Sequence, residues 1–238
     1  MKKLTSIIVF SVFAAASLCA QEVVAEDSFA SLGAWRAAAG TWKASGSLVQ
    51  SDTASHLARI NRSLPQSGVY QIQFTVKYSG GGFKSAKDAA AGRYHGGFGI
   101  HIGVDKAAAS RAWGNGKSYL LWLNLDTEVP ASSPHYGFRA QVYQSFSSSR
   151  MELLDDHNVE VIPADSVFRV LGAYTGRGVP VKIVVNANDG EVRVYDPTAE
   201  NYYYYFYLDP KLLRGSWVSL RTNSLSAAFS DFKVTKLR

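Results

Sequence analysis

The chain of 238 residues contains little cysteine, little methionine and little charge. Its single cysteine excludes a disulfide-stapled scaffold and a zinc site built from thiolates. Only 18% of the residues are charged and 47% are hydrophobic, which excludes the composition of a disordered or acidic-tail protein. The basic residues are dispersed and the net charge is only +6, so nucleic acid is not expected as a partner.

No apolar run is long enough for a transmembrane helix, which needs about 20 apolar residues. The longest run, residues 4–20, follows a Met-Lys-Lys start and ends in small residues, as secretory signal peptides do. We therefore expect residues 1–20 to be removed, Gln21 to begin the mature chain, and the protein to be exported to the periplasm or cell surface. The sequence Ala-Ser-Leu-Cys at 16–19 also resembles a loose lipoprotein motif, so a lipid anchor at Cys19 is the alternative.

The mature chain is rich in tyrosine, phenylalanine and glycine and has only two methionines, which favours β-sheet. Between Val69 and Tyr78, aromatic and branched residues alternate with Gln, Thr and Lys, the pattern of a half-buried strand. We expect further strands at 56–64, 96–104, 118–126, 136–146, 166–174, 179–186, 190–196, 202–208, 216–222 and 227–237. Asp189-Gly190 predicts a hairpin turn between two of them.

This succession of short strands predicts an all-β fold, an antiparallel sandwich with few or no helices. We expect a short N-terminal segment at 21–25 and one domain at 26–238. The Gly- and Ala-rich stretch 79–97 is long for a compact domain, so we expect an excursion or mobile flap there. Residues 86–91 and 106–111 could each form one helical turn.

The start of the expected domain contains a series of aromatic, glycine and polar residues: Phe29, Trp35, Gly40-Thr41-Trp42, Gly46, Leu48 and Gln50. Its last third contains paired apolar segments at 181–185 and 192–195 and a closing pair at 217–222 and 228–234. Together these motifs resemble concanavalin A-like lectin/glucanase jelly-roll modules of the laminin-G-like group. The resemblance implies a jelly roll, and a function only loosely, because this fold serves lectins, hydrolases and structural modules.

Catalysis is not expected, because the acidic residues lack the same-face carboxylate triplet that glycoside hydrolases of this fold use. Asp126 and Glu128 share a face, and we interpret them as two solvated acids at the end of a strand. We interpret the acidic residues at 152–156 as part of a turn. His95 and His101 share a face too, without a third ligand for a metal. The spacing of Asn186-Ala-Asn-Asp-Gly190 does not match a calcium loop, so no metal or cofactor is expected, although calcium occurs in laminin-G-like relatives.

Aromatic and polar residues supply the remaining functional signal. The segment 202–207 carries aromatic side chains on both faces of one strand, of which one face can be core and the other a partner or ligand surface. A second candidate surface forms if strands 118–126 and 136–146 pair on a concave sheet. The candidate residues for ligand or partner binding are Trp122, Asn124, Asp126, Arg139, Gln141, Tyr143, Tyr203, Tyr205 and Tyr207.

These observations predict an exported, non-catalytic module that binds a glycan or a protein partner in the bacterial envelope. The first alternative is a coat or sheath component, because size, signal peptide, absence of mature cysteine and the aromatic strand are similar to those of outer-layer proteins of periplasmic flagellar filaments. That alternative entails self-association. The second alternative is a glycoside hydrolase with an unrecognised site.

Overall fold

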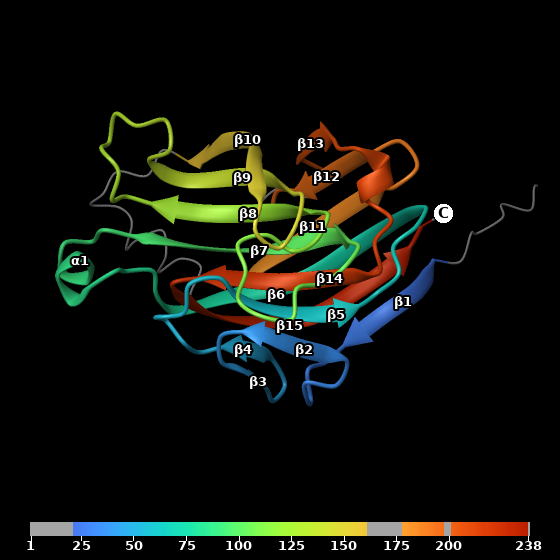
Figure 1. Cartoon of the computed structure of the whole chain (residues 1–238), viewed down its shortest axis with the longest axis horizontal. Helices are drawn as coiled ribbons and strands as arrows, with labels where there is room; N and C mark the ends of the chain where they lie inside the picture. Colours follow the sequence, from blue (N-terminus) through green and yellow to red (C-terminus); the bar gives the residue numbers. More distant parts are fainter. Residues whose placement is uncertain (1–20, 161–177, 198–200, 238) are drawn as a thin grey trace, which may run out of the picture.

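A computed structural model describes residues 21–160, 178–197 and 201–237, and within them the chain forms two antiparallel sheets packed face to face (Figure 1). Sheet A contains β1 (Glu22–Asp27), β3 (Trp42–Ala44), β4 (Leu48–Gln50), β6 (Val69–Gly81), β11 (Val179–Asn186), β12 (Glu191–Tyr195), β13 (Tyr203–Tyr207) and β15 (Leu225–Lys236). Sheet B contains β2 (Trp35–Ala39), β5 (Ala58–Ser63), β7 (His95–Val104), β8 (Ser118–Asp126), β9 (Gly137–Ser145), β10 (Met151–Glu160) and β14 (Trp217–Asn223).

The strand orders are β13-β12-β11-β6-β15-β4-β3, with β1 beside β15, and β10-β9-β8-β7-β14-β5-β2. The expected all-β sandwich is therefore confirmed. A single-turn helix, α1 (Ala86–Ala90), and a 3₁₀ turn at Pro210–Leu212 add little helix. Among the described residues, no helix is both long and apolar enough to cross a membrane.

The core lies between the two sheets and follows from the two-residue period of the strands. On β6, Tyr70, Ile72, Phe74 and Val76 are buried, whereas the intervening Gln and Thr residues are only half-buried. Phe74 packs against Phe229 of β15 with ring centroids 6.0 Å apart. The strand register read from the alternation at 69–78 is confirmed.

The predicted hairpin joins β11 to β12, where Gly190 adopts a φ of +90°. A Cβ there would lie 2.0 Å from the carbonyl oxygen of Leu208, so the turn requires glycine for both conformation and space.

Of four expectations on local structure, two are wrong, one is confirmed and one lies outside the described residues. Residues 152–156, read as a turn, lie in strand β10, whose acidic composition suits an edge strand exposed to solvent. The helical turn at 106–111 does not form, whereas the turn at 86–91 forms as α1 within the excursion between β6 and β7. The strand expected at 166–174 lies outside the described residues.

Candidate functional site

The outward side chains of sheet B form a face that is rich in hydrogen-bonding groups. Alternate residues such as Tyr119, Leu121 and Val142 enter the main core, which turns their neighbours outward. We call this the polar face: His95, Gly97, Gly99 and His101 of β7; Leu120, Trp122, Asn124 and Asp126 of β8; Arg139, Gln141, Tyr143 and Ser145 of β9; Ser219, Arg221 and Asn223 of β14; Arg59 and Asn61 of β5.

Strand register arranges the polar face in rows. Gly97 lies opposite Asn124 on one side and opposite Asn223 on the other, and Asn124 in turn lies opposite Arg139. The next row is Gln141, Trp122, Gly99, Arg221 and Arg59. The second candidate surface depends on the pairing of strands 118–126 and 136–146. That pairing is present, and it brings together the six candidate residues of those strands.

Trp122 is a packing residue rather than an open stacking platform, because only 8% of it is exposed. Its indole lies across β7 over Gly97 and Gly99, which have no side chains. A Cβ on Gly97 would approach the indole to 2.5 Å, and one on Gly99 to 2.9 Å. Arg139 and Gln141 are also buried, whereas Asn124, Asp126 and Tyr143 are partly accessible.

Loop 105–117 covers one end of the polar face. The Arg59 guanidinium donates hydrogen bonds to the carbonyl oxygens of Ser110 and Gly114, both at 2.8 Å. Asn61 Nδ2 donates to the Ala108 carbonyl at 2.9 Å. Sequence reasoning did not identify these anchors. A charged residue between Ala58 and Ile60 indicates an outward side chain, but only the fold shows that a loop lies on it.

Arg221 joins that loop to the sheet. Its guanidinium donates to the Trp113 carbonyl at 2.7 Å and lies 5.2 Å from the Trp113 ring centroid and 5.6 Å from that of Trp122. Burial and the neighbouring charge of Arg59 lower the pKa of Arg221 to about 9. Within the described part of the chain, neither arginine contacts a carboxylate. Trp113 itself is 44% exposed at the edge of the loop.

His101 lies buried beside these arginines. Its Nδ1 is 3.2 Å from Ser118 Oγ, and no described residue partners its Nε2. Burial, reinforced by the positive charges of Arg221 and Arg59, lowers the pKa of His101 well below its usual value. His95 and His101 therefore share a face, as expected, but have separate surroundings.

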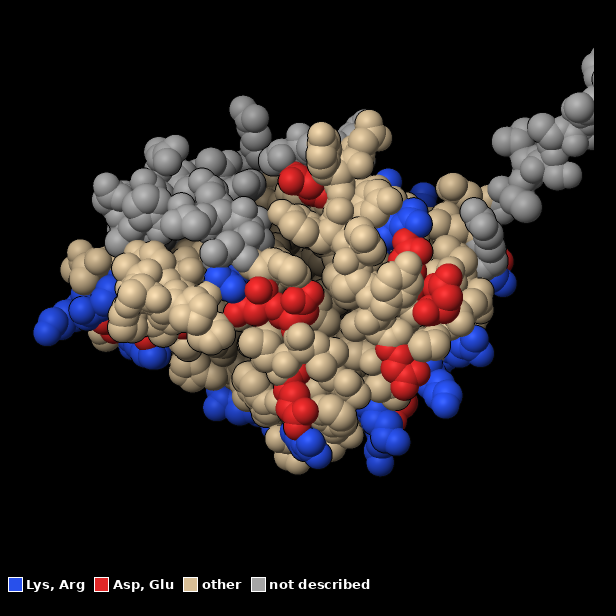
Figure 2. Space-filling model, turned by 90° about the horizontal axis from the view of Figure 1, so that it is seen from above, with Lys and Arg blue, Asp and Glu red and all other residues tan. Residues whose placement is uncertain are grey.

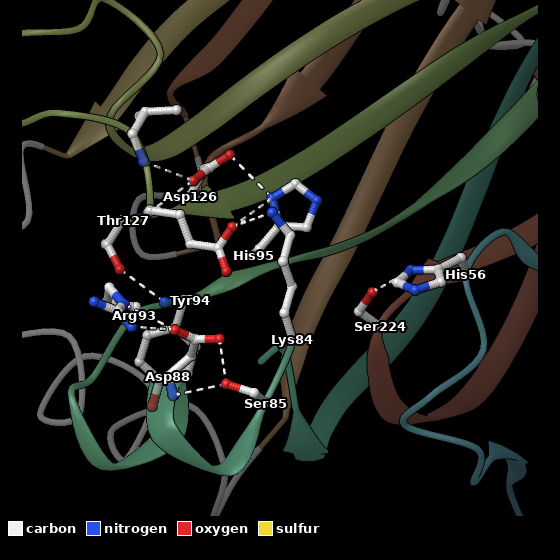
Figure 3. A network of polar contacts seen from close by, with 12 residues as sticks. His56, Lys84, Ser85, Asp88, Arg93, Tyr94, His95, Asp126, Thr127 and Ser224 are labelled. Atoms are coloured by element: carbon white, nitrogen blue, oxygen red, sulfur yellow. Dashed lines mark hydrogen bonds and ion pairs between the residues drawn. The ribbon is translucent and has the colours of Figure 1, made fainter.

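A charged network closes the opposite end of the polar face, where β8 ends (Figure 3). His95 Nδ1 lies 3.1 Å from Asp126 Oδ2 and 3.9 Å from Glu128 Oε2, and Lys84 forms an ion pair with Glu128. Both carboxylates are mostly buried, because Lys84 and His95 pack against them. The interpretation of Asp126 and Glu128 as two solvated acids is therefore wrong. Burial opposes ionisation of Asp126, but hydrogen bonds with His95 and from the Glu128 amide outweigh it and lower the pKa of Asp126.

Arg139 forms an ion pair with Asp156 of β10. Its Nε donates to Asp156 Oδ1 at 2.6 Å, while His135 Nδ1 lies 2.8 Å from Asp156 Oδ2. Burial raises the pKa of Asp156, but the hydrogen bonds with Arg139 and His135 outweigh burial, and the net shift of the pKa is downward. In the described residues, no group of three or more His, Cys, Asp or Glu side chains is arranged to hold a metal ion.

The three candidate tyrosines lie elsewhere, on the outer face of sheet A. Tyr203, Tyr205 and Tyr207 follow one another along β13, and the last two are about two-thirds exposed. Successive rings are 6.5 and 6.4 Å apart with interplanar angles of 68° and 87°. The candidate residues thus divide into two separate surfaces.

Apolar cavities of ≈430 Å³ and ≈310 Å³ lie between the sheets rather than on either outer face. Side chains of both sheets line them, including Phe98, Leu123, Val181 and Tyr204.

No family model matches the chain, and no curated protein is similar to it in sequence. Among solved structures, it is similar to the CBM2 module of the evolved Dit protein of Lactobacillus casei BL23 phage J-1, at 11% identity and a TM-score of 0.55 over 90% of this chain and 95% of that chain. It is also similar to a Bacillus subtilis protein of unknown function with a galectin-like fold, at 12% identity and a TM-score of 0.52 over 91% and 98%. A sialidase is similar at 13% identity and a TM-score of 0.46, over 90% of this chain but 18% of that one, and this weaker likeness carries no argument.

These similarities show the fold: the chain forms the same kind of antiparallel β-sandwich as these structures, which agrees with the jelly roll that the sequence motifs implied. The resemblance to flagellar sheath proteins finds no support in them.

Proposed function

We propose that the protein is an exported, non-catalytic glycan-binding module of the bacterial envelope, and that its ligand lies on the open end of the polar face. The observation that carries this proposal is the row Arg139, Asn124, Gly97, Asn223. Gly97 has no side chain and the Trp122 indole lies over it, so the half-exposed amides of Asn124 and Asn223 stand on either side of the edge of the indole.

The chemistry of this row suits sugar hydroxyls, which both donate and accept hydrogen bonds. Asn124 Oδ1 accepts from Trp122 Nε1 at 3.3 Å and Asn223 Oδ1 from the Leu57 amide at 3.2 Å. Across residues 21–160, 178–197 and 201–237, neither Nδ2 group has a partner, so each keeps two donors for a ligand. His95 and Asp126 form the neighbouring row, and the exposed Trp113 offers an aromatic ring.

The lectin-like and carbohydrate-binding-module folds of the structural neighbours are consistent with this assignment. A hydrolase would need one carboxylic acid that stays protonated near neutral pH, whereas the lowered pKa of Asp126 keeps that group ionised. The lowered pKa of Asp126 therefore argues against Asp126 as that acid, and its contact with His95 favours a positioning role.

Glycan-array screening followed by calorimetry tests the proposal. We expect the double variant Asn124→Ala/Asn223→Ala to lose at least about tenfold in affinity for any glycan that the wild type binds, since unpaired ligand hydroxyls cost about 1–3 kcal/mol. The matched control is Gln71→Ala/Gln73→Ala, which removes two half-buried amides from the outer face of sheet A. Equal affinities of the two double variants would refute the site, and cleavage of the glycan that depends on Asp126 would refute the non-catalytic assignment.

Export is tested separately. The intact mass of the protein recovered from the envelope should correspond to a chain that begins at Gln21. A mass that includes residues 1–20, or a diacyl adduct on Cys19, would contradict this part of the proposal.

A further inference from the structure

The strand β13 is an unprotected edge of sheet A (Figure 1). The described residues form five edge strands, and the other four carry features that discourage pairing with another chain. β1 contains one irregularity in register and three acidic residues. β10 contains two irregularities in register and several acidic residues. β2 and β3 are short and contain Arg36 and Lys43. β13 consists only of aromatic residues and pairs with β12 without a bulge.

The hydrogen-bonding pattern shows which backbone groups face outward from this edge. The amide of Leu208 donates to the Gly190 carbonyl, and the amide of Asp196 donates to the Tyr202 carbonyl, both at 2.9 Å. Because bonded pairs alternate along an antiparallel ladder, the even-numbered residues of β13 bond to β12. The N–H and C=O groups of Tyr203, Tyr205 and Tyr207 therefore point to the free edge.

The side chains of this edge are exposed as well. Tyr202, Tyr203, Tyr204, Tyr205 and Tyr207 are each between 41% and 73% exposed. On the outer side, Arg193 lies over the Tyr203 ring at 5.1 Å and Lys182 over the Tyr195 ring at 4.0 Å. Viewed from the side of β10 and β13, the molecule carries its Lys and Arg side chains mainly around the outline, and separate groups of Asp and Glu lie among uncharged side chains across the middle (Figure 2).

Ring orientation excludes a flat sugar polymer as the natural occupant. Stacking on an extended polysaccharide needs several rings that present their faces to one plane, and successive tyrosines of β13 are turned 68° and 87° from one another. An extended protein strand instead satisfies the outward backbone groups and fits between the tilted rings.

We propose that β13 pairs antiparallel with β13 of a second copy of this chain, about a two-fold axis through Tyr205. In this register Tyr203 faces Tyr207 of the other copy, and Tyr204 faces Phe206. Every position then opposes aromatic to aromatic and none opposes like charges, so the strand is complementary to itself, as an isologous interface requires. The three outward-facing residues form bonded pairs, each exchanging two backbone hydrogen bonds.

The area is sufficient for a specific pair. A fully covered aromatic side chain buries roughly 150–250 Å². Complete coverage of the exposed parts of the five tyrosines would bury roughly 500 Å² per copy, so the pair would then reach the ~1,000 Å² that a specific interface needs.

Disulfide trapping tests both the pairing and its register. Cys19 is the only cysteine, so the chain with Cys19→Ser is free of thiols. Added to that chain, Tyr205→Cys places two thiols opposite each other at a Cα separation of about 5.5 Å, within the range that a disulfide bridges. Tyr207→Cys is the matched control, because its two copies would lie about 13 Å apart along the strands.

We expect mild oxidation to convert the Tyr205→Cys protein largely to a covalent dimer and to cross-link the Tyr207→Cys protein at least about tenfold less. Equal cross-linking of both, or cross-linking of Tyr207→Cys alone, would overturn the proposal.

Sedimentation equilibrium gives an independent readout. Tyr205→Lys opposes two lysines at the axis and should weaken dimerisation at least about 30-fold, whereas Tyr205→Phe should change it less than about threefold. Val24→Lys, at an exposed apolar position of β1, should leave it unchanged. A wild-type protein that stays monomeric at ~100 µM, or a Tyr205→Lys dimer as tight as the wild type, would refute the pairing. Glycan affinity per site is unaffected by either result, so the proposed function stands or falls separately.

Discussion

The polar face of sheet B and the tyrosine edge of sheet A use similar residues in opposite ways. On the polar face, Trp122 and Arg221 are buried, stacked and held under loop 105–117. On the edge, the aromatic side chains stand in solvent and contact mainly one another. Aromatic and cationic side chains therefore stabilise the fold where a loop covers them, and they are available for association where they stay exposed.

Truncating one aromatic residue in each region should give the largest contrast. Trp122→Ala removes an indole packed on Gly97 and Gly99, and we expect a loss of about 3–5 kcal/mol in the free energy of unfolding. Tyr205→Ala should change it by less than about 0.5 kcal/mol. Urea unfolding at low protein concentration measures both, and equal losses would remove the distinction between the regions.

Replacing one arginine in each region should also cost more stability on the polar face than at the edge. Arg59→Leu leaves the carbonyl groups of Ser110 and Gly114 without their donors, so we expect it to cost about 3 kcal/mol. Arg193→Leu at the edge should cost less than about 1 kcal/mol, because the ion pair of Arg193 with Glu191 is largely solvated. A stable Arg59→Leu protein would show that the loop does not depend on its anchor.

A pH titration isolates His101. Because its pKa is lowered by folding, the unfolded chain takes up the proton first, and the stability that this group contributes is present above pH ~6.5 and lost as the pH falls below it. The slope should approach about 1.4 kcal/mol per pH unit between pH 6 and 5. His101→Gln should flatten it, and an unchanged slope would assign the effect to other groups.

Removing the charge of Asp126 in the charged network should change the stability least. The lowered pKa of Asp126 means that its contribution is present above pH ~3.9 and is lost as the pH falls further. We expect Asp126→Asn to cost about 1 kcal/mol at pH 7 and to reduce the loss of stability below pH 4. Denaturant midpoints at pH 7 and pH 3 check this. The same midpoint shift at both values would argue against an ionised Asp126.

Alternation along single strands was enough to predict the sandwich and the register of β6, because burial of one face imposes the two-residue period. The pairing of β8 with β9 stayed a condition, because alternation in one strand does not identify its neighbour. Alternation was also not enough at the sheet edge, where β10 carries the acidic residues of a turn because only one side of it pairs. The anchoring of loop 105–117 by Arg59 and Arg221 depends on contacts between residues 50 to 110 positions apart, which no local pattern encodes. Trp122 was recognised as a candidate, but its burial follows from two glycines on a neighbouring strand.

The most direct test of the account is where a bound glycan perturbs the protein. Titration of ¹⁵N-labelled protein with a glycan that it binds should shift the side-chain amide signals of Asn124 and Asn223 and the backbone signals of residues 95–99. Signals of residues 203–207 should change only if the dimer changes, and not at all in the Tyr205→Lys variant. Shifts confined to residues 203–207, with Asn124 and Asn223 unmoved, would contradict the assignment of the polar face as the ligand site.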